Sequence, residues 1–105
     1  MTNPEFLKLD ENSKERLEIF KNSPKFSENS LVTLGEFLFK IDELPIPHSL
    51  FLSDDGNLVL SWRDNLRGII ELEFLDQKIF YYIETLKLED YSPIIEVLSL
   101  INKVK

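Results

Sequence analysis

The chain has 105 residues, of which 43% are hydrophobic and 30% charged; it carries no cysteine and a net charge of −7. This composition excludes an intrinsically disordered chain, a disulfide-stabilised scaffold, a thiol nucleophile and a cysteine-bound zinc site. It favours a single domain over residues 1–105, with enough length to bury one modest core.

The first predicted element is an amphipathic helix from Asp10 to Asn22. Leu17 and Phe20 share one face of this helix, whereas its other positions are mostly charged. Asn12 or Ser13 is the expected N-cap, because both side chains can accept a backbone N–H at a helix start.

A second helix is predicted from about Ser30 to Glu43, with Ser27 or Ser30 as its N-cap. Its apolar residues recur at helical spacing: Leu31, Leu34, Phe37, Leu38 and Ile41. Gly35 costs roughly 1 kcal/mol relative to alanine inside a helix, so it indicates close packing at that point. Pro45-Ile46-Pro47 ends the helix in an extended segment.

A β-hairpin is predicted from the segment that ends at Trp62, the only tryptophan. Asp54-Asp55-Gly56 forms its three-residue loop, with Gly56 at the position that needs a positive φ. This loop creates the pairs Leu52 with Leu58, Leu50 with Leu60 and His48 with Trp62. A two-residue loop would instead pair Ser53 with Leu58, so the three-residue loop sorts the apolar side chains better.

Two further turns extend the predicted sheet. Arg63-Asp64-Asn65, with Asn65 in the left-handed conformation, is predicted to pair Trp62 with Leu66. A two-residue turn at Asp76-Gln77 then gives the pairs Phe74 with Ile79, Leu72 with Tyr81 and Ile70 with Ile83. All three turns place the large aliphatic residues on one core face, and this agreement supports the assignment.

The last predicted element is a helix from about Pro93 to Lys103, because Pro93 suits the first helical position. Its apolar stripe consists of Ile94, Leu98 and Ile101. The predicted fold class is therefore α+β: two N-terminal helices, a four-stranded antiparallel meander and a C-terminal helix.

Few residues suit catalysis. His48 is the only histidine and lies between Pro47 and Ser49, with no Ser-His-Asp or His-rich setting nearby in sequence, and the pair Asp54 and Asp55 fits a hairpin loop. No glycine-rich phosphate loop is present. We therefore expect a protein that is not an enzyme, with no cofactor and no metal. The alternative, a small metal-dependent hydrolase, would use three acids of the predicted sheet: Glu71, Glu73 and Glu84.

The sheet face opposite the core mixes aromatic and acidic side chains. Seven residues on or next to it form the predicted partner-binding set: Phe51, Val59, Glu71, Glu73, Phe80, Tyr82 and Glu84. Aromatic side chains supply buried anchors in an interface, and acids steer and orient a basic partner. The alternative is that a helix covers this face.

The negative charge is concentrated in residues 27–62, where six acids face a single base and the net charge is −5. Such a chain repels nucleic acid and attracts basic proteins, so we expect a basic protein partner and no direct nucleic-acid binding. Solubility alone is the alternative reason for this charge. Without a basic leader or an apolar stretch of roughly 20 residues, we expect a soluble cytoplasmic protein that does not enter a membrane.

The order Pro45-x-Pro47, Asp55-Gly56-x-Leu58-x-Leu60-x-Trp62 and Ile70-x-Leu72-x-Phe74 resembles a pattern of small uncharacterised bacterial proteins. The resemblance covers about residues 30–84 and implies no catalytic residue. In size and charge the chain is also similar to acidic inhibitors as a class: antitoxins, immunity proteins and phage anti-CRISPR proteins. This similarity implies a protein that blocks a toxin, nuclease or defence complex. The alternative is a homodimeric structural or accessory module of a bacterial or phage system.

Overall fold

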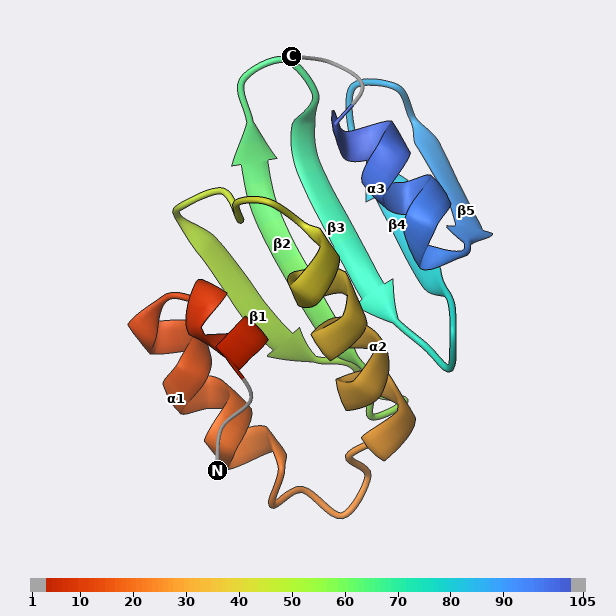
Figure 1. The fold of residues 1–105 in the computed structure, drawn as a ribbon. Helices are drawn as coiled ribbons and strands as arrows, with labels where there is room; N and C mark the ends of the chain where they lie inside the picture. Colours follow the sequence, from red (N-terminus) through yellow and green to blue (C-terminus); the bar gives the residue numbers. More distant parts are fainter. Residues whose placement is uncertain (1–3, 103–105) are drawn as a thin grey trace.

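The computed structural model describes residues 4–102, which form an α+β fold around one five-stranded antiparallel sheet. The elements in chain order are the 3₁₀ helix η1 (Pro4–Lys8), α1 (Glu11–Phe20), α2 (Glu28–Lys40), β1 (His48–Leu52), β2 (Leu58–Asp64), β3 (Gly68–Phe74), β4 (Ile79–Ile83), β5 (Leu88–Ser92) and α3 (Ile94–Asn102). The strands lie in the order β1-β2-β3-β4-β5. In Figure 1, α2 and α3 lie across one face of the sheet and α1 lies beside β1. We call the helix-covered side the inner face and the opposite side the outer face.

The first two helices are confirmed, but the N-cap of α1 differs from the prediction. Asp10 has an extended backbone, and its carboxylate accepts the Ser13 N–H at 2.8 Å. Asn12 and Ser13 are inside the first turn, so the prediction of either as the cap is wrong. Ser27 caps α2 by accepting the N–H of Ser30 at 3.2 Å.

Gly35 marks a close approach between α2 and η1. A Cβ at this position would lie 3.3 Å from Cζ of Phe6. Next to this contact, the Lys8 ammonium donates to the carbonyl oxygens of Leu38 and Ile41 at 2.7 and 2.6 Å. These carbonyls lie at the C-terminal end of α2, where they have no helical partner and the dipole favours a cation. Contact and charge together hold η1 on α2.

The β1–β2 hairpin has the predicted register, with the pairs His48–Trp62, Leu50–Leu60 and Leu52–Leu58. Gly56 has φ +86°, and a Cβ there would collide with the carbonyl oxygen of Lys25. Ser27 donates its N–H to Gly56 at 3.0 Å, and Leu58 donates its N–H to the Ser30 hydroxyl at 2.7 Å. The turn requires glycine for both conformation and space, and it is anchored on the start of α2.

The β2–β3 register differs from the prediction. Trp62 pairs with Ile70 rather than with Leu66, so each β2 residue meets a β3 residue four positions further along. Because four is an even number, the same β3 side chains still point to the inner face. The predicted core face is therefore right although the predicted pairing is wrong.

The reason for this difference is a longer turn held by Asp64. Its carboxylate accepts the N–H groups of Leu66 and Arg67 at 2.8 and 2.9 Å. Gly68, with φ +72°, supplies the left-handed residue that the prediction assigned to Asn65. Burial raises the pKa of Asp64. The two N–H groups and the Arg67 charge together lower it by more than burial raises it, so its pKa lies below the ordinary value.

The β3–β4 hairpin has the predicted register, with the pairs Ile70–Ile83, Leu72–Tyr81 and Phe74–Ile79. The prediction of four strands is wrong, because β5 pairs with β4 as a fifth strand. Its sequence, Leu-Glu-Asp-Tyr-Ser, puts two acids side by side and lacks apolar–polar alternation. All but the last of its residues are exposed, so β5 has no buried face that would impose an alternating pattern.

The core lies between the inner face and the helices. The strands contribute Leu50, Leu58, Leu60, Trp62, Ile70, Leu72, Phe74, Ile79, Tyr81 and Ile83. Phe37 of α2 contacts Phe74 with ring centroids 5.4 Å apart, and Val97 of α3 is also buried. Trp62 is therefore a core residue, as predicted. The predicted end of the last helix, Lys103, lies outside the described residues.

Candidate functional site

The outer face is covered by none of the helices in residues 4–102 (Figure 1). All seven predicted partner-binding residues lie on this side, and none is buried. Phe51 comes from β1, Val59 from β2, Glu71 and Glu73 from β3, Phe80 and Tyr82 from β4, and Glu84 from the residue after β4. The alternative of a helix over this face is not the arrangement found.

One row of side chains crosses the whole outer face, with one residue from each strand. Cross-strand pairing joins Phe51 to Val59, Val59 to Glu73, Glu73 to Phe80 and Phe80 to Tyr91. The rings of Phe80 and Tyr91 lie 4.8 Å apart between centroids, at an interplanar angle of 53°. We call this set the aromatic row. Tyr91 is 55% exposed and is missing from the predicted set because β5 was not predicted.

A second row lies next to the aromatic row and is polar. In strand order it consists of Ser49, Ser61, Glu71, Tyr82 and Glu89. Glu71 and Glu89 lie on either side of Tyr82, and both are exposed. We call this set the acidic row. Two carboxylates beside a tyrosine hydroxyl offer acceptors to a lysine or arginine side chain.

Basic side chains lie at the two ends of the aromatic row. The Arg16 guanidinium lies 5.9 Å from the centroid of the Phe51 ring, and the Lys78 ammonium lies 5.0 Å from that of Tyr91. Both distances suit cation–π contacts. Glu71 and Glu73 lie on the central strand β3, whereas these two cations lie toward the sides of the outer face.

The acids of the predicted set differ in what they contact. Oε2 of Glu73 accepts the side-chain amide of Asn57 at 3.0 Å. Oε1 of Glu84 accepts the N–H of Ile69 at 3.0 Å, so this carboxylate supports the β2–β3 turn. Among the described residues no hydrogen bond or ion pair reaches the Glu71 carboxylate, and Glu71 is exposed, which makes it the acid best placed to meet a partner.

His48 lies on the inner side of the sheet, away from Glu71 and Glu73 on the outer face. His48 is buried; its Nδ1 donates to the carbonyl of Pro45 at 2.7 Å, and its Nε2 accepts the N–H of Asp10 at 3.0 Å. Both ring nitrogens therefore have structural partners. Within residues 4–102, no group of three or more acidic or histidine side chains could hold a metal ion.

Asp10 joins the capped end of α1 to β1. Its Oδ2 lies 3.7 Å from Nε2 of His48. Burial raises the pKa of Asp10, but hydrogen bonding from Ser13 and the nearby His48 lower it more, so its pKa lies below the ordinary value of 3.8. This arrangement ties two elements together and does not resemble an acid–base pair open to a substrate.

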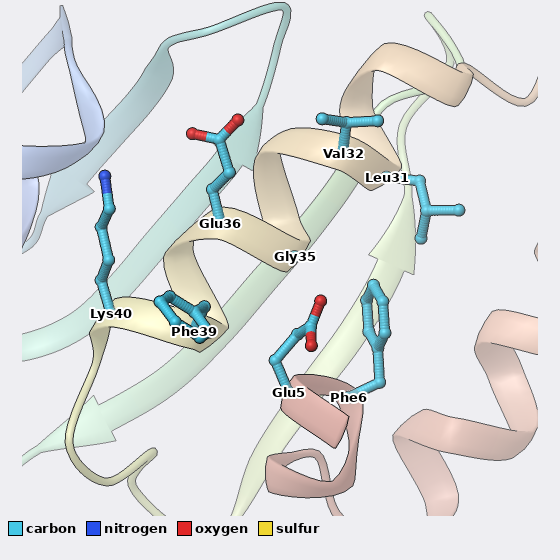
Figure 2. A pocket seen from close by; sticks show the side chains of 8 residues that line it. All are labelled: Glu5, Phe6, Leu31, Val32, Gly35, Glu36, Phe39 and Lys40. Atoms are coloured by element: carbon cyan, nitrogen blue, oxygen red, sulfur yellow. The ribbon is translucent and has the colours of Figure 1, made fainter. Parts of the chain in front are cut away.

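A second exposed surface lies on the helical side of the molecule. A hollow of about 350 Å³ lies between η1 and α2. Figure 2 shows two of the residues that line it, Gly35 on α2 and Phe6 on η1. Val32 and Phe39 line it and are 60% and 73% exposed. They lie seven residues apart, outside the core stripe of α2, and this helical spacing is the sequence signal for a second apolar surface on α2.

Comparison with known proteins gives no relative: no family model, no curated protein and no solved structure matches the chain. No helix within the described part of the chain is long and apolar enough to cross a membrane.

Proposed function

We propose that this protein is a non-enzymatic acidic binding protein that docks on a basic protein partner through the outer face. The observation that carries the proposal is the uncovered sheet face, where the aromatic row lies beside the exposed Glu71 and Glu89. Aromatic anchors beside acids suit a cationic surface, because the anchors bury apolar area while the acids pair with bases.

The mechanism is occlusion of the partner's basic surface. A toxin, a nuclease or a phage-defence complex that works on nucleic acid needs exposed lysine and arginine side chains. The outer face would cover those side chains, and the net charge of −7 would speed the encounter. This places the protein with cytoplasmic inhibitors of the antitoxin, immunity or anti-CRISPR kind, and it requires no cofactor.

The test begins with affinity capture of the partner from the native cell, followed by titration of matched variants. The variant Glu71→Lys/Glu73→Lys should bind at least about tenfold more weakly, which corresponds to ~1.4 kcal/mol. The control Glu36→Lys/Glu96→Lys makes the same change in charge on exposed helix positions and should keep its affinity. An equal loss in both variants would reduce the interaction to net charge and contradict the proposal.

The alternative is a homodimeric structural or accessory module in which the outer faces of two copies meet. Its support is the aromatic row, because Phe51 and Tyr91 are 44% and 55% exposed. Two such faces would also bring Glu71 and Glu73 of both copies together, which opposes pairing. Sedimentation at micromolar concentration separates the two hypotheses, since a monomer excludes the module.

A further inference from the structure

The two edges of the sheet differ in what covers them. The β1 edge has α1 beside it, and the Arg16 guanidinium donates to the carbonyl oxygen of Leu50 at 3.4 Å. Beyond β5, Figure 1 shows no other element. An uncovered edge exposes backbone hydrogen-bonding groups that another extended chain can pair with.

The register identifies which β5 groups point outward. Leu75 donates its N–H to Lys78, and Glu84 donates its N–H to Ile69, each at 2.9 Å. Because hydrogen-bonded pairs alternate in an antiparallel ladder, the even-numbered residues of β4 bond to β3 and the odd-numbered ones to β5. The β5 residues opposite those odd-numbered positions are Leu88, Asp90 and Ser92. The backbone groups of Glu89 and Tyr91 therefore point away from the sheet.

One of these outward groups already has a partner. The Asp90 carboxylate accepts the N–H of Tyr91 at 2.8 Å. Within the described chain no other hydrogen bond reaches these outward backbone groups. The N–H and C=O of Glu89 and the C=O of Tyr91 are therefore open to pair with an added strand. A base next to Asp90 would attract its carboxylate and release the Tyr91 N–H to pair with an added strand.

The side chains of β5 indicate what kind of strand fits. Glu89 and Tyr91 extend the acidic and aromatic rows, because they lie opposite Tyr82 and Phe80. Glu89 and Asp90 are exposed, and β5 contains no basic residue. A second copy of β5 would bring its own acids against these, whereas a lysine- or arginine-bearing strand would complement them.

We infer that β5 receives an extended basic segment of the partner as a sixth strand. This inference rests on the proposed function and specifies how the partner binds. Backbone hydrogen bonds to Glu89 and Tyr91 would supply affinity, and basic side chains at alternate positions would supply specificity.

A capped heptapeptide of alternating lysine and valine is the probe for this edge. Glu89→Gln removes the charge and keeps the backbone N–H, whereas Glu89→Pro also removes the N–H, which makes no bond to β4. Glu89→Pro should bind the peptide at least about tenfold more weakly than Glu89→Gln. At saturating peptide, the Glu89 amide of the unmodified protein should exchange with solvent at least about tenfold more slowly.

A second experiment covers the case in which Glu89→Pro does not fold. The same peptide with every backbone nitrogen methylated keeps its charge but has no N–H to donate, and its methyl groups prevent close approach to the β5 backbone, so it should not protect the Glu89 amide. Equal binding by both peptides, equal binding by both variants, or no peptide binding would overturn the inference. Protection that rises with protein concentration alone would point to a second copy instead and would also overturn it.

These outcomes differ from those that test the proposed function. If the captured partner loses affinity for Glu71→Lys/Glu73→Lys but binds Glu89→Pro and Glu89→Gln equally, the outer-face proposal stands and the edge inference fails. If both outer-face and control variants behave alike, the proposed function fails whatever the peptide does.

Discussion

On β2, Leu58, Leu60 and Trp62 point toward the helices and are buried, whereas Val59 and Ser61 between them are partly exposed. The same strand thus supports a tightly packed inner face and an outer face that is open to solvent. Burial of the inner side chains provides most of the stabilisation, because it removes apolar surface from water. The outer face contributes little to this stabilisation, so its side chains are available for binding.

Truncating neighbouring residues on β2 tests this difference between the inner and outer faces most directly. Leu60 is fully buried, so Leu60→Ala should cost ~2–5 kcal/mol of unfolding free energy through lost contacts and the cavity left behind. Val59→Ala should cost less than ~1 kcal/mol. Urea denaturation of both variants measures the difference. A similar cost for both would mean that the outer face is packed as tightly as the inner one.

A medium effect is expected at two serines, one on each side of the sheet. Ser30 is fully buried and its hydroxyl accepts the Leu58 N–H, so Ser30→Ala should cost ~1–3 kcal/mol by leaving that donor unpaired. Ser61→Ala on the outer face should change the unfolding free energy by less than ~0.5 kcal/mol. If thermal melting shows no loss for Ser30→Ala, the Ser30 hydroxyl does not contribute to anchoring the β1–β2 hairpin on α2.

The smallest effect concerns Asp10, which joins the helical layer to β1. Its pKa is lowered in the folded protein, so its ionised form stabilises the fold above its unfolded pKa near 3.8. That contribution is lost as the pH falls through the still lower folded pKa. Asp10→Asn keeps a side-chain oxygen that can accept the Ser13 N–H but removes the negative charge at the start of α1, so it should cost up to ~1 kcal/mol at pH 7.

The pH profile distinguishes this contribution from other effects of the substitution. The stability gap between wild type and Asp10→Asn should narrow between about pH 4 and pH 2, as measured by urea denaturation at each pH. Asp55→Asn removes the same charge from an exposed turn residue that caps neither α1 nor α2, so it is the matched control. A gap that stays constant down to pH 2 would contradict the role assigned to the Asp10 carboxylate.

Much of the fold could be predicted because its signals are local. Gly56 after two aspartates predicts the loop, and the loop length sets which of Leu58 and Val59 faces the core. The β2–β3 pairing was missed because Gly68, rather than Asn65, takes the left-handed conformation. Asp64 holds that longer turn by accepting two backbone N–H groups, and neither hydrophobic alternation nor a turn dipeptide specifies such contacts.

The candidate site was predictable only in part. The alternation along β1 to β4 identifies the outer-face residues of those strands. Glu89 and Tyr91 lie on β5, which was not predicted because its two adjacent acids interrupt the apolar–polar alternation of a strand. Alternation also cannot tell which acids are already bonded. Glu84 holds the Ile69 N–H, whereas Glu71 is exposed, and that distinction comes from the folded arrangement.

The sequence by itself determined the α+β class, the positions of the three α-helices and the division of β1 to β4 into two faces. These features follow from hydrophobic spacing, capping residues and turn chemistry, which act over a few neighbouring residues. Three features came only from the tertiary structure: β5 completes the sheet, α2 and α3 cover the inner face while α1 lies beside β1, and the β5 edge is open. These depend on contacts between residues far apart in the chain, which no local pattern specifies.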